Sequence, residues 1–184
     1  MTHKAKAVLL RLSAMRAAAV KEFASNPYVT IHDYSNSSSV EKSDPFTVWI
    51  DLNYPVYVLE DNNPVLKQDG IKDICIKFNT DYPAQRPKVI LPVNIASIHT
   101  WSNNTASFHT MYNPQTYNIV KEISNVMTLA ANCPEVVNFS SPNPDHRWLI
   151  QWTQESLKNK TLPTVPYEQL VAANRKVRRS MPKL

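Results

Sequence analysis

Glycine is almost absent from this sequence, since Gly70 is the only one among 184 residues, against 14 prolines. The loops that hold nucleotide phosphates need several glycines at fixed spacing, because their backbone must approach the phosphate closely. The sequence therefore excludes the common dinucleotide-binding and P-loop sites, and we expect no cofactor. It also lacks a continuous apolar run of about 18 residues, so it predicts no membrane-spanning helix.

Cysteine is nearly as scarce, with Cys75 and Cys133 lying in unrelated contexts. Neither belongs to a metal-type or redox-type pair, which favours free thiols and an intracellular, reducing compartment. Zinc sites need three or four ligands, and the histidines at 99, 109 and 146 have no second ligand cluster near them in the sequence. We expect no metal site.

Acidic residues are missing from both ends of the chain. Residues 1–21 and 175–184 each carry five basic residues and no acid, so residues 22–174 hold the other ten basic residues and all 15 acids. The net charge of the whole chain is therefore +5, whereas residues 22–174 carry a net charge of −5. The C-terminal basic residues expected to contact neighbouring proteins include Arg175, Lys176, Arg178 and Arg179. The tails lack the interleaved aromatic residues that nucleic-acid binding would use, which argues against that partner.

The first segment predicts an amphipathic helix ending at Ser25-Asn26-Pro27. Its apolar face consists of Val8, Leu12, Met15, Ala19 and Phe23. A basic, acid-free helix also resembles a mitochondrial targeting segment, which leaves a mitochondrial matrix or membrane-associated location open. We favour an ordinary first helix of the domain, because its apolar face continues into the rest of the domain.

Alternating apolar residues predict four strands, at 28–34, 46–53, 74–78 and 88–91. Turn residues stand at Asp61-Asn62-Asn63-Pro64, and successive strands joined by turns form an antiparallel meander. Pro83 and Pro87 lack an N–H and cannot sit inside a paired ladder, so the connection between the last two strands should be a stiff, exposed bend.

Beyond these strands the sequence predicts an irregular flap and then helices. The flap covers 93–115, which shows no sustained period. Asn113-Pro114 offers a helix start, and an apolar stripe comes next at Ile119, Val120, Ile123, Val126, Met127 and Ala130. Asp145 is the expected N-cap of a helix that places Trp148 and Trp152 four residues apart, at a core seam or a partner contact. A last helix is predicted from Pro166 to Arg179.

The segment Tyr82-Pro83-Ala84-Gln85-Arg86-Pro87-Lys88-Val89, together with this order of elements, resembles the ubiquitin-conjugating enzyme (UBC) superfamily, which includes silent variants and RWD domains. Active members usually read Tyr-Pro-x-x-Pro-Pro-Lys-Val here, whereas Arg86 replaces the first of the paired prolines. The looser RWD form, Tyr-Pro-x-x-x-Pro, is matched strictly. The resemblance covers residues 8–160 and implies a UBC-like α+β fold.

The resemblance also implies where an active site would lie. Matching the flap residue by residue places His99-Thr100-Trp101 on the family's His-Pro-Asn, and His109 on the cysteine that would carry the thioester. A thioester needs a thiolate, because an acyl-imidazole hydrolyses too readily to act as a carrier. We therefore expect no catalytic residue: His99, Trp101 and His109 would be degenerate active-site positions.

Taken together, the sequence predicts a non-catalytic UBC-like protein that serves as a structural or interaction subunit of a larger protein assembly. Residues 1–25 form its first helix, 26–162 its domain and 163–184 a basic helical extension. Two alternatives remain open. One is an adaptor that binds ubiquitin or a ubiquitin-like protein, and the other is a divergent conjugating enzyme that uses Cys133.

Overall fold

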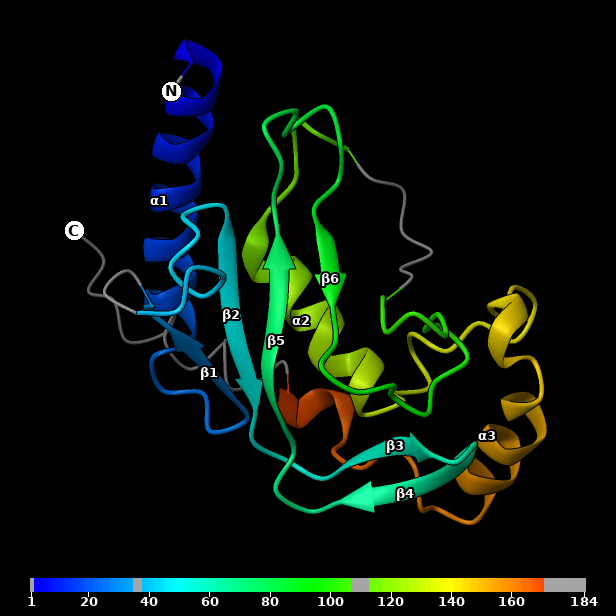
Figure 1. Cartoon of the computed structure of the whole chain (residues 1–184). Coiled ribbons are helices and arrows are strands. Elements are labelled where there is room, and N and C mark those ends of the chain that lie inside the picture. The colour runs from blue at the N-terminus through cyan, green and yellow to red at the C-terminus, as the bar shows by residue number, and fades with distance from the viewer. Residues whose placement is uncertain (1, 35–37, 107–112, 171–184) are drawn as a thin grey trace.

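A computed structural model of the chain describes residues 2–34, 38–106 and 113–170. The fold is mixed α+β, with a long N-terminal helix, an antiparallel sheet, and further helices after the sheet (Figure 1). These helices are α1 (His3–Phe23), α2 (Ile119–Ala130) and α3 (Leu149–Lys158). The sequence prediction of an α+β chain with these parts in this order is confirmed at that level.

The main sheet has four antiparallel strands in the order β1-β2-β5-β6. Their bounds are β1 (Val29–His32), β2 (Thr47–Leu52), β5 (Ile71–Lys77) and β6 (Lys88–Ile90). The register pairs Val48 with Ile76 and Ile50 with Ile74, so their apolar side chains share one face. These are the four strands that the alternation of apolar residues predicted.

A two-stranded hairpin, which the pattern of apolar residues did not predict, is inserted between β2 and β5. It consists of β3 (Val56–Glu60) and β4 (Asn63–Lys67), and it extends away from the sheet toward α3 (Figure 1). Its turn residues Asp61 and Asn62 have φ of 48° and 61°, the left-handed pair that a tight hairpin turn requires. The predicted turn is therefore real, but it lies inside this extra hairpin.

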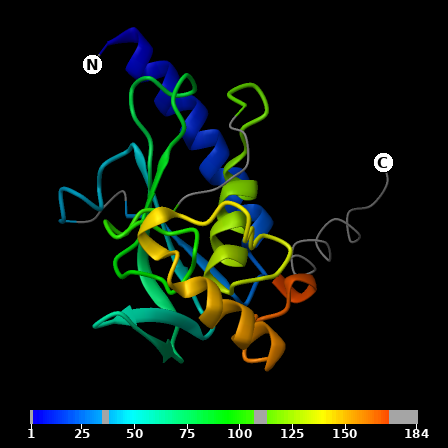
Figure 2. The ribbon, with the colours of Figure 1, turned by 90° about the vertical axis from the view of Figure 1, so that its right-hand side faces the viewer.

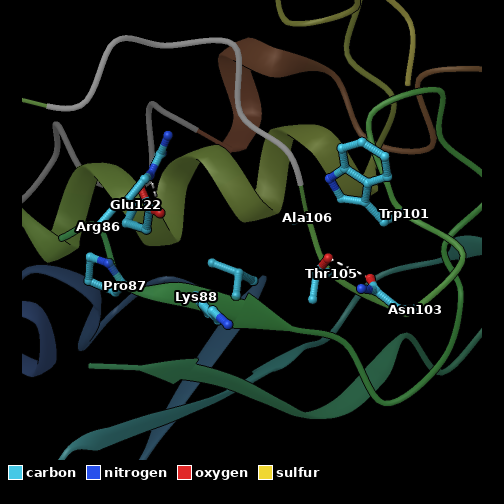
Figure 3. A pocket seen from close by; sticks show the side chains of 9 residues that line it. Arg86, Pro87, Lys88, Trp101, Asn103, Thr105, Ala106 and Glu122 are labelled. Atoms are coloured by element: carbon cyan, nitrogen blue, oxygen red, sulfur yellow. Dashed lines mark hydrogen bonds and ion pairs between the residues drawn. The ribbon is translucent and has the colours of Figure 1, made fainter. Parts of the chain in front are cut away.

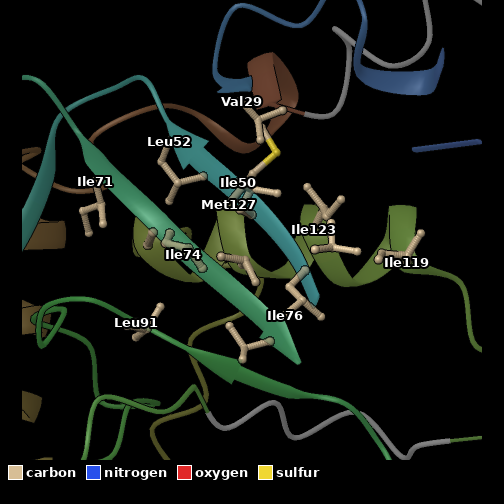
Figure 4. Close-up of a cluster of buried hydrophobic side chains, with 14 of the residues drawn as sticks. Val29, Ile50, Leu52, Ile71, Ile74, Ile76, Leu91, Ile119, Ile123 and Met127 are labelled. Carbon is tan, nitrogen blue, oxygen red and sulfur yellow. The ribbon is translucent and has the colours of Figure 1, made fainter. Parts of the chain in front are cut away.

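The core lies between the inner face of the sheet and α2 (Figure 4). Ile50, Ile74 and Ile76 meet Ile123 and Met127 of α2, all of them buried. Full burial of one such side chain stabilises the fold by roughly 1.5–3 kcal/mol. Helix α1 lies beside α2 (Figure 2) and contributes Val8, Leu12, Ala19 and Phe23 to this core. Ala5 of α1 is buried as well.

The helix boundaries differ in part from the predicted ones. Helix α2 begins at Ile119 with Asn118 as its N-cap, so a start at Asn113-Pro114 was wrong. Asp145 does not cap α3, because it lies in a single 3₁₀ turn (Pro144–His146) before that helix. Residues 167–170 are helical, and the rest of the last predicted helix lies outside the described residues. In the described parts of the chain, no helix is both long and apolar enough to cross a membrane.

Candidate functional site

The proline bend is anchored by one buried aromatic side chain, Tyr82. Its ring packs edge-on against Phe78 and Tyr117, with ring centroids 5.1 Å and 5.7 Å away. The Arg11 guanidinium of α1 lies 5.1 Å from the same ring, and the peptide bond to Pro83 is cis. Contacts with Arg11 of α1 and with Tyr117, just before α2, therefore hold the bend in place. The bend in turn fixes where β6 begins.

A hollow of about 390 Å³ opens beside the start of β6 (Figure 3). It lies between β6, the flap and α2, with Trp101 at one end and Arg86 at the other. The Arg86 guanidinium pairs with the Glu122 carboxylate of α2, with an Nη2–Oε2 distance of 2.9 Å and Nε–Oε1 of 3.3 Å. Glu122 is only 3% exposed, so this fork-to-fork pair neutralises a buried charge.

Arg86 and Glu122 were not predicted to meet. Each residue is unusual in its own segment of the sequence. Arg86 departs from the motif that its segment otherwise resembles, and Glu122 stands beside the apolar stripe of α2. A carboxylate at such a position needs a partner, because burying an unpaired charge is costly. The sequence could not say which cation supplies it.

The remaining charge at the hollow is basic. Lys88 lines it and is exposed, and the sheet register places Lys77 directly opposite Lys88 on the neighbouring strand. Among the described residues neither lysine has an ion-pair partner. Like charges directly opposite on adjacent strands repel, so an acidic group brought next to Lys88 would be stabilised by both lysines.

The structure separates the two flap residues that the family resemblance singled out. His99 is buried, and its Nε2 accepts a hydrogen bond of 2.8 Å from the Asn138 N–H. Trp101 is 39% exposed, although its backbone is fixed by a 2.8 Å bond from its N–H to the Thr105 carbonyl. His99 thus supports the flap, and Trp101 presents an indole at the surface. His109 lies outside the described residues.

The Trp101 segment is joined to the segment that carries Trp148. Asp145 accepts hydrogen bonds from both the N–H and the hydroxyl of Ser102, at 3.0 Å and 2.7 Å. These bonds lower the pKa of Asp145. Trp148, three residues after Asp145, is 47% exposed. We call Trp101 and Trp148, with the hollow, the tryptophan surface.

Trp152 is not part of this surface. It is half-buried on α3, and its ring meets Tyr57 of the β3–β4 hairpin edge-on at 5.2 Å. Trp148 precedes α3 as its N-cap residue and remains exposed. The two tryptophans were expected to act as one i, i+4 pair, but they have different environments. Trp152 packs against the β3–β4 hairpin, whereas Trp148 is exposed at the surface.

Three basic side chains of α1 are engaged by the rest of the chain. Lys4 pairs with Asp81 at 2.7 Å, Arg11 lies against Tyr82, and Arg16 donates to the Thr47 carbonyl. These contacts integrate α1 into the domain. The C-terminal residues Arg175, Lys176, Arg178 and Arg179 lie outside the described residues.

Both thiols are free and buried. Burial raises the pKa of Cys75 and of Cys133 to about 12 in each case. Cys133 is 0% exposed, and its Sγ lies 3.6 Å from the Val165 carbonyl oxygen. A nucleophile reacts as the thiolate, so neither cysteine has the environment of an activated one.

Acid should loosen the junction between the flap and the segment before α3. His146 is buried there, and burial lowers its pKa below the ordinary value of 6.5, against the opposing effect of Asp145. As the pH drops below about 6.5, the unfolded chain binds a proton at this histidine that the folded chain does not yet bind. The free energy of unfolding therefore has its full value above that pH and decreases as the pH drops toward the lowered pKa. Urea unfolding at pH 7 and pH 5 measures this loss.

His146→Gln is the matched variant, and it should flatten the stability profile between pH 7 and pH 5. Asp145, whose pKa is lowered from 3.8, contributes only at more acidic pH. An unchanged slope in His146→Gln would show that this histidine does not control the junction.

In the described ranges, no group of three or more His, Cys, Asp or Glu side chains is arranged to hold a metal ion. The hollow is instead bounded by an indole, two amide or hydroxyl side chains, a lysine and an internal ion pair. No protein-family model and no curated protein sequence matches this chain.

Proposed function

We propose that this protein is a non-catalytic UBC-like subunit that binds another protein of a larger assembly through its tryptophan surface. The observation that carries the proposal is the pair of exposed indoles, Trp101 and Trp148, on segments joined by Asp145 and Ser102. Tryptophan dominates binding energy at protein interfaces when it is buried by a partner. The positive charges of Lys77 and Lys88 favour an acidic partner face.

The UBC-like part of the proposal rests on the order of the elements. The helix, antiparallel sheet, proline bend, irregular flap and later helices occur in the order that the resemblance implies, with the β3–β4 hairpin as an addition. The non-catalytic part is supported by the burial and raised pKa of both thiols.

The test is recovery of the complex from cells that make the protein naturally, using a tagged chain. The double variant W101A/W148A should lose at least about tenfold of the recovered stoichiometric partner, since hot-spot tryptophans typically contribute about 2 kcal/mol or more. Leu10→Ala is the matched control, because Leu10 is 75% exposed on α1, away from this surface. Equal recovery by the double variant and the control would contradict the proposal.

The two alternatives give different results. A partner that is recovered only together with ubiquitin or a ubiquitin-like protein would favour the adaptor. Incubation with such a protein, an activating enzyme and ATP tests the enzyme: a reductant-sensitive adduct that disappears in Cys133→Ser would overturn the non-catalytic proposal.

A further inference from the structure

A second cluster of aromatic and charged side chains lies on the outer face of the sheet, around Lys42. The Lys42 ammonium lies 4.7 Å from the centre of the Tyr34 ring and 5.8 Å from the Trp49 ring. It also pairs with the Asp73 carboxylate at 2.6 Å. Two aromatic faces and one carboxylate around a cation form the chemistry of an ammonium-binding site.

The walls of this site are held by contacts that do not involve Lys42. The Tyr34 ring stacks on His32, with centroids 5.0 Å apart and planes 10° from parallel, and its hydroxyl donates to Asp73. The Trp49 indole N–H donates to the Thr47 hydroxyl at 2.9 Å. Removing the lysine should therefore leave a formed site.

Asp73 is positioned by the backbone as well. Its φ is +58°, an uncommon conformation for a residue other than glycine, and its N–H donates to the Asp51 carboxylate at 2.9 Å. It lies near the point where the β2–β5 register shifts. This local irregularity turns the Asp73 carboxylate toward Lys42. The hydrogen bond between the two side chains lowers the pKa of Asp73 and raises the pKa of Lys42.

The lysine reaches the site from a turn that is built mainly from local bonds. The N–H groups of Lys42, Ser43 and Asp44 are bonded three or four residues back along the chain. The side chains of Lys42 and Asp73 are 30% and 43% exposed, and a hollow of about 210 Å³, which Lys42 lines together with Tyr34 and Trp49, adjoins the lysine. The site can thus be reached from solvent once this turn moves.

We propose that Tyr34, Trp49 and Asp73 form a binding site for the ammonium group of a lysine, filled here by Lys42 of the same chain and open to a lysine of a partner protein when residues 38–45 lift from the sheet. Asp73 selects a primary ammonium, because a quaternary one has no N–H to donate.

The test is the variant Lys42→Ala, titrated with Nα-acetyl-lysine methylamide while the Trp49 indole N–H signal is followed by NMR. A tethered lysine competes at an effective concentration in the millimolar range, so the variant should bind the probe about tenfold or more tightly than the unchanged protein. The trimethyllysine analogue should bind more weakly, and the norleucine analogue should not bind. The other three indole signals report that the fold is intact.

Lys72→Ala is the matched control, since Lys72 is also exposed on this sheet but pairs with Asp51 and not with the rings. Adding Asp73→Asn to Lys42→Ala should abolish the gain in affinity. The proposal is overturned if Lys42→Ala binds the lysine probe no better than Lys72→Ala, or if the trimethylated probe binds as well as lysine. Neither outcome depends on the tryptophan surface or its partner.

Discussion

Replacing the single glycine by alanine, Gly70→Ala, should lower the free energy of unfolding by at least about 3 kcal/mol. Gly70 has φ of +75°, and a Cβ built on it would lie 1.9 Å from the Leu52 carbonyl oxygen and 2.9 Å from that of Tyr54. Both oxygens belong to the backbone, so no side-chain rotation relieves the clash. Urea unfolding followed by circular dichroism measures the loss.

Asn62→Ala separates backbone strain from the clash at Gly70. Asn62 also has positive φ, 61°, at the exposed tip of the β3–β4 hairpin. Alanine there should cost only about 1 kcal/mol, which is the cost of the left-handed conformation itself. If Gly70→Ala cost no more than Asn62→Ala, the close approach of the Leu52 carbonyl would not be what reserves position 70 for glycine.

Arg86→Ala should lower the free energy of unfolding by about 2–3 kcal/mol. This is less than the roughly 3–5 kcal/mol lost when one partner of a fully buried ion pair is removed, because the Arg86 side chain is partly exposed. The loss arises because Glu122, only 3% exposed, keeps a charge without its partner. Adding Glu122→Leu to Arg86→Ala should recover part of the stability, since an apolar side chain suits that position on α2. Chemical denaturation of both single variants and the double variant gives the coupling energy.

Lys4→Ala provides the comparison for Arg86→Ala. It breaks the Lys4–Asp81 pair, whose side chains are 65% and 53% exposed, and should change stability by no more than about 0.5 kcal/mol. An Arg86→Ala variant as stable as Lys4→Ala would mean that Glu122 is satisfied without the guanidinium, and the hollow would then not be braced by this pair.

Much of the fold could be predicted because the signals are local. Alternation at Val48, Ile50 and Leu52 predicts a strand that packs one face in the core, although Thr47 and Trp49 on its other face are buried as well. The stripe at Ile119, Ile123 and Met127 predicts a helix with a buried face. Each pattern depends only on the geometry of its own segment. The position of the extra hairpin was missed because its turn residues predict a reversal but not which strands it joins.

The candidate site could be predicted only in pieces. Trp101 and Trp148 were each singled out, yet their association depends on hydrogen bonds between Ser102 and Asp145, 43 residues apart. The same carboxylate was expected to cap α3. Asp145 can bond whichever donor the fold brings near, so its local role could not be read from its neighbours in the sequence.

The proline bend shows the division most clearly. The sequence by itself determined that residues 82–87 form a stiff connection, because proline restricts the backbone wherever it stands. Only the tertiary structure decided that Arg86 would leave this bend to meet Glu122 on α2, 36 residues away. Backbone restriction is a local property, whereas the pairing of buried charges is settled by which segments pack together.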